Sequence, residues 1–229
     1  MKNTDSLRDE IRMQHEKMSQ ESFSKKLEYF WDYYKIHVMI TVFLACMFGS
    51  ILHTIVSQKE TLLSIALINA FPNVEDELLM EDFENYLGLD NKKQQVLIDS
   101  TYYLDDESTS PYATTYSQKF STNAMAGKLD VVLADSHNFD FYGNQGFFQN
   151  LSFILSKEML DKYHDSLYYV DHPYDETSEL VPIGIRIDQV GKIQETSCYP
   201  GTDAYFGILT DTEHIDTALL YLEYLEHKK

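Results

Sequence analysis

The sequence predicts an α/β domain that follows a single transmembrane helix. The helix is indicated by residues 38–56, which contain no Asp, Glu, Lys or Arg. The α/β class is indicated by residues 57–229, where apolar runs typical of buried strands alternate with segments whose apolar residues have helical spacing. Of the 229 residues, 44% are hydrophobic, which is enough for a packed core. We therefore expect a mixed sheet flanked by helices.

The apolar run Val38–Val56 would span roughly 28 Å as an α-helix, close to the thickness of the hydrocarbon core of a bilayer. A buried helix of a soluble protein normally has a polar face, and this run has none. A cleaved signal peptide fits less well, because 37 residues precede the run. Lipidation at Cys46 is a second alternative, but the apolar run continues past that cysteine, where a mature lipoprotein turns polar.

The residues before the run are typical of a membrane interface. Three lysines lie near this end, at positions 25, 26 and 35, whereas only Lys59 lies close to the other end. Aromatic residues that suit the headgroup level also gather here: Tyr29, Phe30, Trp31, Tyr33 and Tyr34, next to Lys35. The positive-inside rule then predicts a cytoplasmic juxtamembrane segment (1–37), a transmembrane helix (38–56) and an extracytoplasmic domain (57–229) at the cell membrane.

The negative charge lies almost entirely in the domain after the helix. Residues 1–37 hold seven basic and seven acidic residues, so the rest of the chain has 18 − 7 = 11 basic and 37 − 7 = 30 acidic residues, a net charge of −19. A domain this acidic repels the phosphates of nucleic acids, so we expect no nucleic-acid partner. The expected partners are the bilayer, through one helix, and a small solute or a protein.

The expected elements follow one another in α/β order. Strands are predicted over 61–68, 95–104, 130–135, 182–187 and 205–210. Helices are predicted over 74–87, 112–126, 157–164 and 213–227, with a short helix and turn over 137–146 and a loop over 105–111. Gly88 and Gly127 follow two of these helices and are natural stops.

The order of these pieces resembles one lobe of the type II extracellular solute-binding proteins of bacteria. The resemblance covers roughly residues 60–229. It is carried by Gly127–Asp135, in which a helix stop leads to an Asp-Val-Val strand, by the aromatic and glycine-containing segment Phe141–Leu151, by Val181-Pro-Ile-Gly-Ile185 and by the closing helix Glu213–His227. It implies a periplasmic-binding-protein-like lobe without catalytic activity. About 170 residues remain after the helix, so we expect a single lobe rather than a two-lobed clamp, and the sequence does not say whether another chain supplies a second lobe.

Candidate binding residues follow from the rule that open α/β sheets bind ligands at the carboxyl ends of their strands. These ends carry polar and aromatic side chains: Asn69, Phe71, Ser100, Thr101, Tyr102, Asp135, Ser136 and His137. The alternative is that they only form turns and helix caps, for which Asn, Ser and Asp are ordinary choices.

The sequence contains only weak indications of metal binding or catalysis. Asp135, His137 and Asp140 lack the spacing of a metal site, and Asp105-Asp-Glu107 lacks that of a calcium loop. Cys198 has no histidine near it in the sequence, and its distance from Cys46 argues against a disulfide. We therefore expect no cofactor, no metal and no enzyme. The predicted function is membrane-anchored binding or interaction; the alternatives are a structural or assembly subunit that docks a protein and, more remotely, an extracellular enzyme.

Overall fold

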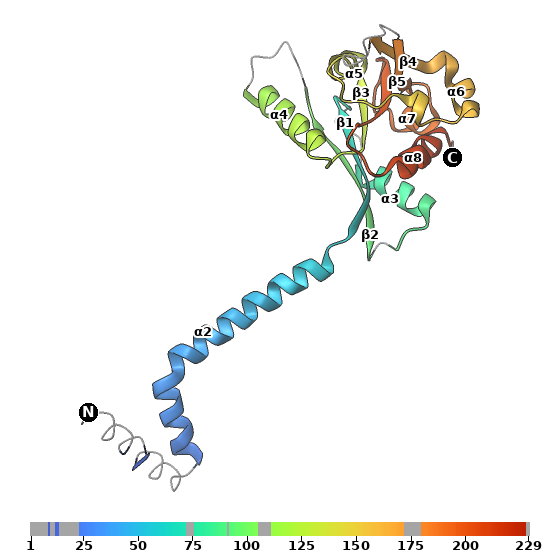
Figure 1. Ribbon diagram of the computed structural model, residues 1–229. Coiled ribbons are helices and arrows are strands. Elements are labelled where there is room, and N and C mark those ends of the chain that lie inside the picture. The colour runs from blue at the N-terminus through green and yellow to red at the C-terminus, as the bar shows by residue number, and fades with distance from the viewer. Residues whose placement is uncertain are drawn as a thin grey trace. The chain divides into compact units, whose positions relative to one another are not determined.

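The computed structural model describes residues 9, 12–13, 23–71, 76–90, 92–104, 111–171 and 180–227. The chain divides into two compact units, Met1–Gln58 and Lys59–Lys229. The first contains the long helix α2 (Phe23–Ser57), and the second contains the sheet and the remaining helices (Figure 1).

Helix α2 contains a stretch, Tyr34–Ser57, that is long and apolar enough to cross a membrane. None of this stretch is buried against the rest of the protein. Its weakly polar residues are satisfied within the helix, since the hydroxyl of Thr41 donates to the His37 carbonyl at 2.8 Å and that of Thr54 to the Ser50 carbonyl at 3.0 Å. The helix is therefore compatible with a single-pass membrane protein.

Aromatic residues occupy the start of this stretch, as the sequence predicts. Phe30, Trp31 and Tyr34 are all exposed, and the rings of Phe30 and Tyr34 stack with their centroids 5.0 Å apart. The side chains of Tyr29 and Tyr33 lie outside the described part of the structure. Exposed aromatic rings beside an apolar helix suit a membrane interface.

The second unit is built on a six-stranded mixed sheet with the order β2-β1-β3-β6-β5-β4. Its strands are β1 (Glu60–Ile68), β2 (Gln94–Tyr102), β3 (Val131–Asp135), β4 (Leu167–Asp171), β5 (Leu180–Arg186) and β6 (Ala204–Ile208). Strand β1 lies between β2 and β3 and pairs parallel with both, whereas β6, β5 and β4 add antiparallel pairs. The mixed α/β class predicted from the sequence is confirmed.

Helices cover both faces of this sheet (Figure 1). They are α3 (Asp76–Leu87), α4 (Pro111–Met125), α5 (Ser136–Gly143), α6 (Lys157–Tyr163), α7 (Gly191–Thr196) and α8 (Ile215–Glu226), with short 3-10 turns at Leu151–Phe153 and His164–Ser166. Alternate side chains of β1 point to opposite faces of the sheet and join the core on each face. Leu63, Ile65 and Leu67 pack with α3, α7 and α8, whereas Ala66 and Ile68 pack with α4 and α5.

The structure adds two elements that the sequence pattern did not predict, β4 and α7. It also shortens the second predicted strand, which ends at Tyr102 rather than at residue 104. Asn69 causes this early end, because its side chain takes both backbone hydrogen bonds of Leu104. The loop predicted over 105–111 lies outside the described residues up to position 110.

Candidate functional site

The strand order of the sheet reverses at β1. The chain passes from β1 to β2 on one side and then returns to β3 on the other side. In open α/β sheets such a reversal opens a crevice at the carboxyl ends of the strands, and ligands bind there. A ligand site is therefore expected at the carboxyl ends of β1 and β3.

Asn69, directly after β1, joins three segments at this edge. Its backbone is left-handed, with φ of 54°, a conformation that Asn tolerates better than most residues. Its side-chain oxygen accepts from the Leu104 amide at 2.7 Å, while its Nδ2 donates to the Leu104 carbonyl at 2.8 Å and to the Asp135 carboxylate at 2.8 Å. One side chain thus ties β1 to the segment after β2 and to the end of β3.

Asp135, the last residue of β3, is the N-cap of α5. Its carboxylate accepts from the Asn138 amide at 3.1 Å and from the Asn138 side chain at 2.9 Å, in addition to Asn69. A carboxylate at a helix N-terminus is also favoured by the helix dipole. Asp135 therefore has a full structural role as a cap, and it also presents negative charge at the edge of the crevice.

Tyr199 is buried against the carboxyl ends of β1 and β3. Its hydroxyl donates to the carbonyls of Ile68 and Leu133, at 3.0 and 2.8 Å, and so bridges β1 and β3. The amide of Phe71 donates to the Cys198 carbonyl at 2.7 Å, which holds the two segments together. Burial raises the pKa of Tyr199 well above its usual range, so this hydroxyl stays protonated.

What remains above Tyr199 is an open hollow of about 450 Å³. Its lining comes from three places in the sequence and consists of Asn69, Phe71, Asp135, Ser136, His137, Tyr199, Pro200 and Thr202. Phe71 keeps 47% of its surface exposed, and Ser136, His137 and Thr202 are exposed as well. Such a lining can stack against a flat apolar group and can form hydrogen bonds to a polar one.

Five of the eight residues predicted from strand ends line this hollow, namely Asn69, Phe71, Asp135, Ser136 and His137. Whether they bind a ligand stays a prediction. Sequence reasoning missed Tyr199, Pro200 and Thr202, which enter only because a distant loop folds onto the strand ends. The turn-forming Pro200-Gly201 pair marks that loop but does not reveal where it packs.

The other three predicted residues do not line the hollow, because they belong to β2, on the far side of β1 from β3. Tyr102 is buried, and its ring packs edge-on against Phe120 with centroids 5.7 Å apart. Lys119 donates to the Asp99 carboxylate at 2.8 Å and to the Thr101 hydroxyl at 3.0 Å. Ser100 lies in the same strand, half-buried.

The cysteines and the candidate metal-binding residues form the remaining candidates for chemistry. Both cysteines are free, and Cys198 is fully buried with its sulfur 2.7 Å from the Thr196 hydroxyl. Among the described residues, no three His, Cys, Asp or Glu side chains gather as a metal site. The acidic segment at residues 105–107, which lacks the pattern of a calcium loop, lies outside the described residues.

Comparisons with family models, with curated proteins and with solved structures find no match. The resemblance to a solute-binding lobe therefore stays a prediction from sequence.

Proposed function

We propose that the protein is a membrane-anchored binding protein without catalytic activity, whose α/β domain recognises a small solute at the strand-end hollow. The observation that carries this proposal is the position of the hollow. It lies at the carboxyl ends of β1 and β3, where the strand order reverses, and residues from three segments converge on it.

The chemistry of the hollow is consistent with recognition of a solute. The exposed ring of Phe71 offers an apolar surface, and the Ser136 and Thr202 hydroxyls and the His137 ring offer hydrogen-bonding groups beside it. A few polar groups around an apolar surface are typical of small-ligand sites. The domain is also proposed to be similar to one lobe of a solute-binding protein, because its strands and helices follow one another in the order that carries the resemblance.

The proposed location is the outer side of the cell membrane. The lysines at positions 25, 26 and 35 precede the apolar span, whereas Lys59 is the single basic residue of positions 57–91. This asymmetry favours a cytoplasmic N-terminus and an extracytoplasmic domain.

A thermal-shift screen of the full chain in detergent tests the binding proposal. The probes are amino acids, short peptides and sugars. A ligand present at about 100 times its Kd stabilises the folded domain by roughly 2.7 kcal/mol, which raises Tm by roughly 5–10 °C for a domain of this size.

Two alanine variants locate the site of any such ligand. Phe71→Ala should abolish the shift, because it removes the exposed ring from the hollow. Phe153→Ala is the matched control, since Phe153 is 87% exposed and lies outside the hollow. No shift with any probe, or an equal loss in both variants, would refute the proposal.

A second candidate function is an assembly subunit that docks a protein. It is favoured by Tyr199, which is buried against the strand ends and leaves a shallow surface rather than an enclosed cavity. This second candidate would be supported if no probe in the thermal-shift screen raised Tm and if a partner protein bound the chain but not the Phe71→Ala variant.

A further inference from the structure

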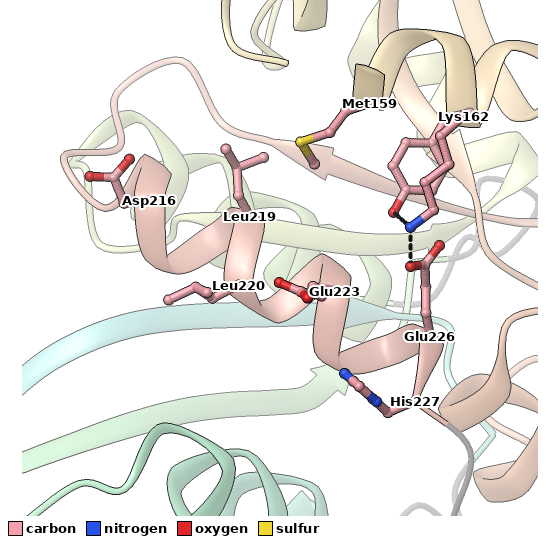
Figure 2. A pocket seen from close by; sticks show the side chains of 9 residues that line it. Met159, Lys162, Asp216, Leu219, Leu220, Glu223, Glu226 and His227 are labelled. Atoms are coloured by element: carbon pink, nitrogen blue, oxygen red, sulfur yellow. Dashed lines mark hydrogen bonds and ion pairs between the residues drawn. The ribbon is translucent and has the colours of Figure 1, made fainter. Parts of the chain in front are cut away.

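A groove lies between α6 and α8, away from the strand-end hollow (Figure 2). Its volume is about 730 Å³. Its apolar part consists of Met159 from α6 together with Leu219 and Leu220 from α8, and Leu220 is 41% exposed. The groove therefore places exposed apolar side chains among charged ones on an acidic domain.

The groove exists because α8 packs only one side into the core. Ala218, Tyr221, Leu222 and Leu225 are buried against the sheet, whereas Leu219 and Leu220 lie on the groove side. One end of the groove is closed by the ion pair between Lys162 of α6 and Glu226 of α8, drawn as a dashed line in Figure 2.

The charge around the groove is unbalanced. Lys162 forms an ion pair with Glu226 and also lies over the ring of Tyr163, with its Nζ 4.8 Å from the ring centroid. Asp216 and Glu223 line the same groove and are exposed, and neither has a cationic partner among the described residues. The groove therefore combines an apolar floor with two uncompensated carboxylates.

We propose that the α6–α8 groove docks a basic amphipathic segment of a partner protein. Apolar side chains of that segment would contact Met159, Leu219 and Leu220, and its Lys or Arg residues would face Asp216 and Glu223. Complementary charge supports this occupant, because the domain carries the whole net charge of −19 and attracts basic partners over long range. A second copy of this chain would bring the same negative charge to the groove, so self-docking is disfavoured.

A binding measurement with a designed probe tests this proposal. The full chain is placed in phosphatidylcholine nanodiscs, whose lipid has no net charge. A dye-labelled peptide with Leu at helical spacing and Lys at the flanking positions is titrated by fluorescence anisotropy, and a peptide with Glu in place of Lys is titrated in parallel. The Lys peptide should bind and the Glu peptide should not.

Paired variants separate the groove from general attraction to an acidic domain. The double variant Asp216→Asn/Glu223→Gln should weaken binding of the Lys peptide by roughly fivefold at low salt, as expected for two exposed ion pairs. Leu220→Ser should weaken it as well. The control Glu81→Gln/Asp171→Asn removes two exposed carboxylates elsewhere and should leave binding unchanged.

Several outcomes would overturn the proposal: no binding of the Lys peptide, equal binding of both peptides, or equal weakening by both double variants. Self-association of the chain that depends on Asp216 and Glu223 would assign the groove to a second copy instead. None of these outcomes affects the strand-end hollow, which is tested by Phe71.

Discussion

At the scale of single residues, three polar side chains hold the strand ends together. Asn69 and Asp135 bond to each other and to neighbouring segments, and Tyr199 bridges the carbonyls of Ile68 and Leu133. The sequence placed Asn69 and Asp135 at this edge, because polar residues directly follow apolar runs there. It could not place Tyr199, since its contacts are separated by 66 and 131 positions in the chain.

Tyr199→Phe tests the bridging hydroxyl. The change removes the hydroxyl, whose single proton is shared between the two carbonyls, without changing the ring, so we expect a loss of about 1–2 kcal/mol in the free energy of unfolding. Urea denaturation of the full chain in detergent measures it. Tyr169→Phe is the control, because Tyr169 is 43% exposed and should tolerate the change within error. Equal stability of the two variants would show that the bridge contributes nothing.

The Asp99–Lys119 pair gives a test by pH. Burial acts to raise the pKa of Asp99, but hydrogen bonds from Lys119 and Thr101 outweigh it and hold the pKa below the ordinary value. A lowered pKa contributes stability above about pH 4, the unfolded-state value, and that contribution is lost as pH falls through the folded-state pKa. Because both side chains are partly exposed, we expect less than about 1 kcal/mol.

Lys119→Gln should raise the pKa of Asp99, as followed by carbon NMR of its carboxyl group, and should flatten the acid dependence of unfolding below about pH 4. The exposed Lys128→Gln is the control and should change neither. An unchanged Asp99 titration in Lys119→Gln would contradict the assigned pairing.

At the scale of elements, strands and helices with a continuous or periodic apolar pattern were predictable, and short elements without one were not. β1 and β3 are buried along most of their length, so their sequences are nearly continuous apolar runs. β4 has the same length as β3 and β6 but is exposed or half-buried along most of its five residues, and α7 has only six residues, so neither shows a continuous apolar run or a clear period. Both elements owe their conformation to packing partners rather than to their own pattern.

Gly184 shows how closely α5 packs on the sheet. A Cβ at this position in β5 would meet the Phe139 ring of α5 and would lie 3.1 Å from the Phe206 carbonyl oxygen of β6. Gly184→Ala should therefore cost about 1–3 kcal/mol by overpacking, measured by urea denaturation.

The double variant Gly184→Ala/Phe139→Leu provides the internal control. If the ring is the obstacle, the double variant should be more stable than the sum of the two single effects predicts. Strict additivity would place the strain elsewhere.

At the scale of the whole molecule, the chain combines an apolar helix with an acidic α/β domain. The helix and the fold class followed from the sequence, because continuous apolar length and alternating β and α patterns are local signals. The shape of the hollow and of the α6–α8 groove did not follow, since both depend on how distant segments pack. The proposed orientation across the membrane follows from the lysine positions, because more lysines lie near the N-terminal end of the apolar run than near its C-terminal end.

The most direct test of the proposed anchored domain is cysteine labelling in intact cells. Thr202 lies at the hollow and is exposed, and Ser24 lies in the first turn of α2, before the apolar span, and is also exposed. The unsubstituted chain gives the background, because Cys46 lies within the apolar span and Cys198 is buried. With a membrane-impermeant maleimide, Thr202→Cys should label in intact cells and Ser24→Cys only after permeabilisation. Labelling of Ser24→Cys in intact cells, with Thr202→Cys protected until permeabilisation, would contradict the account.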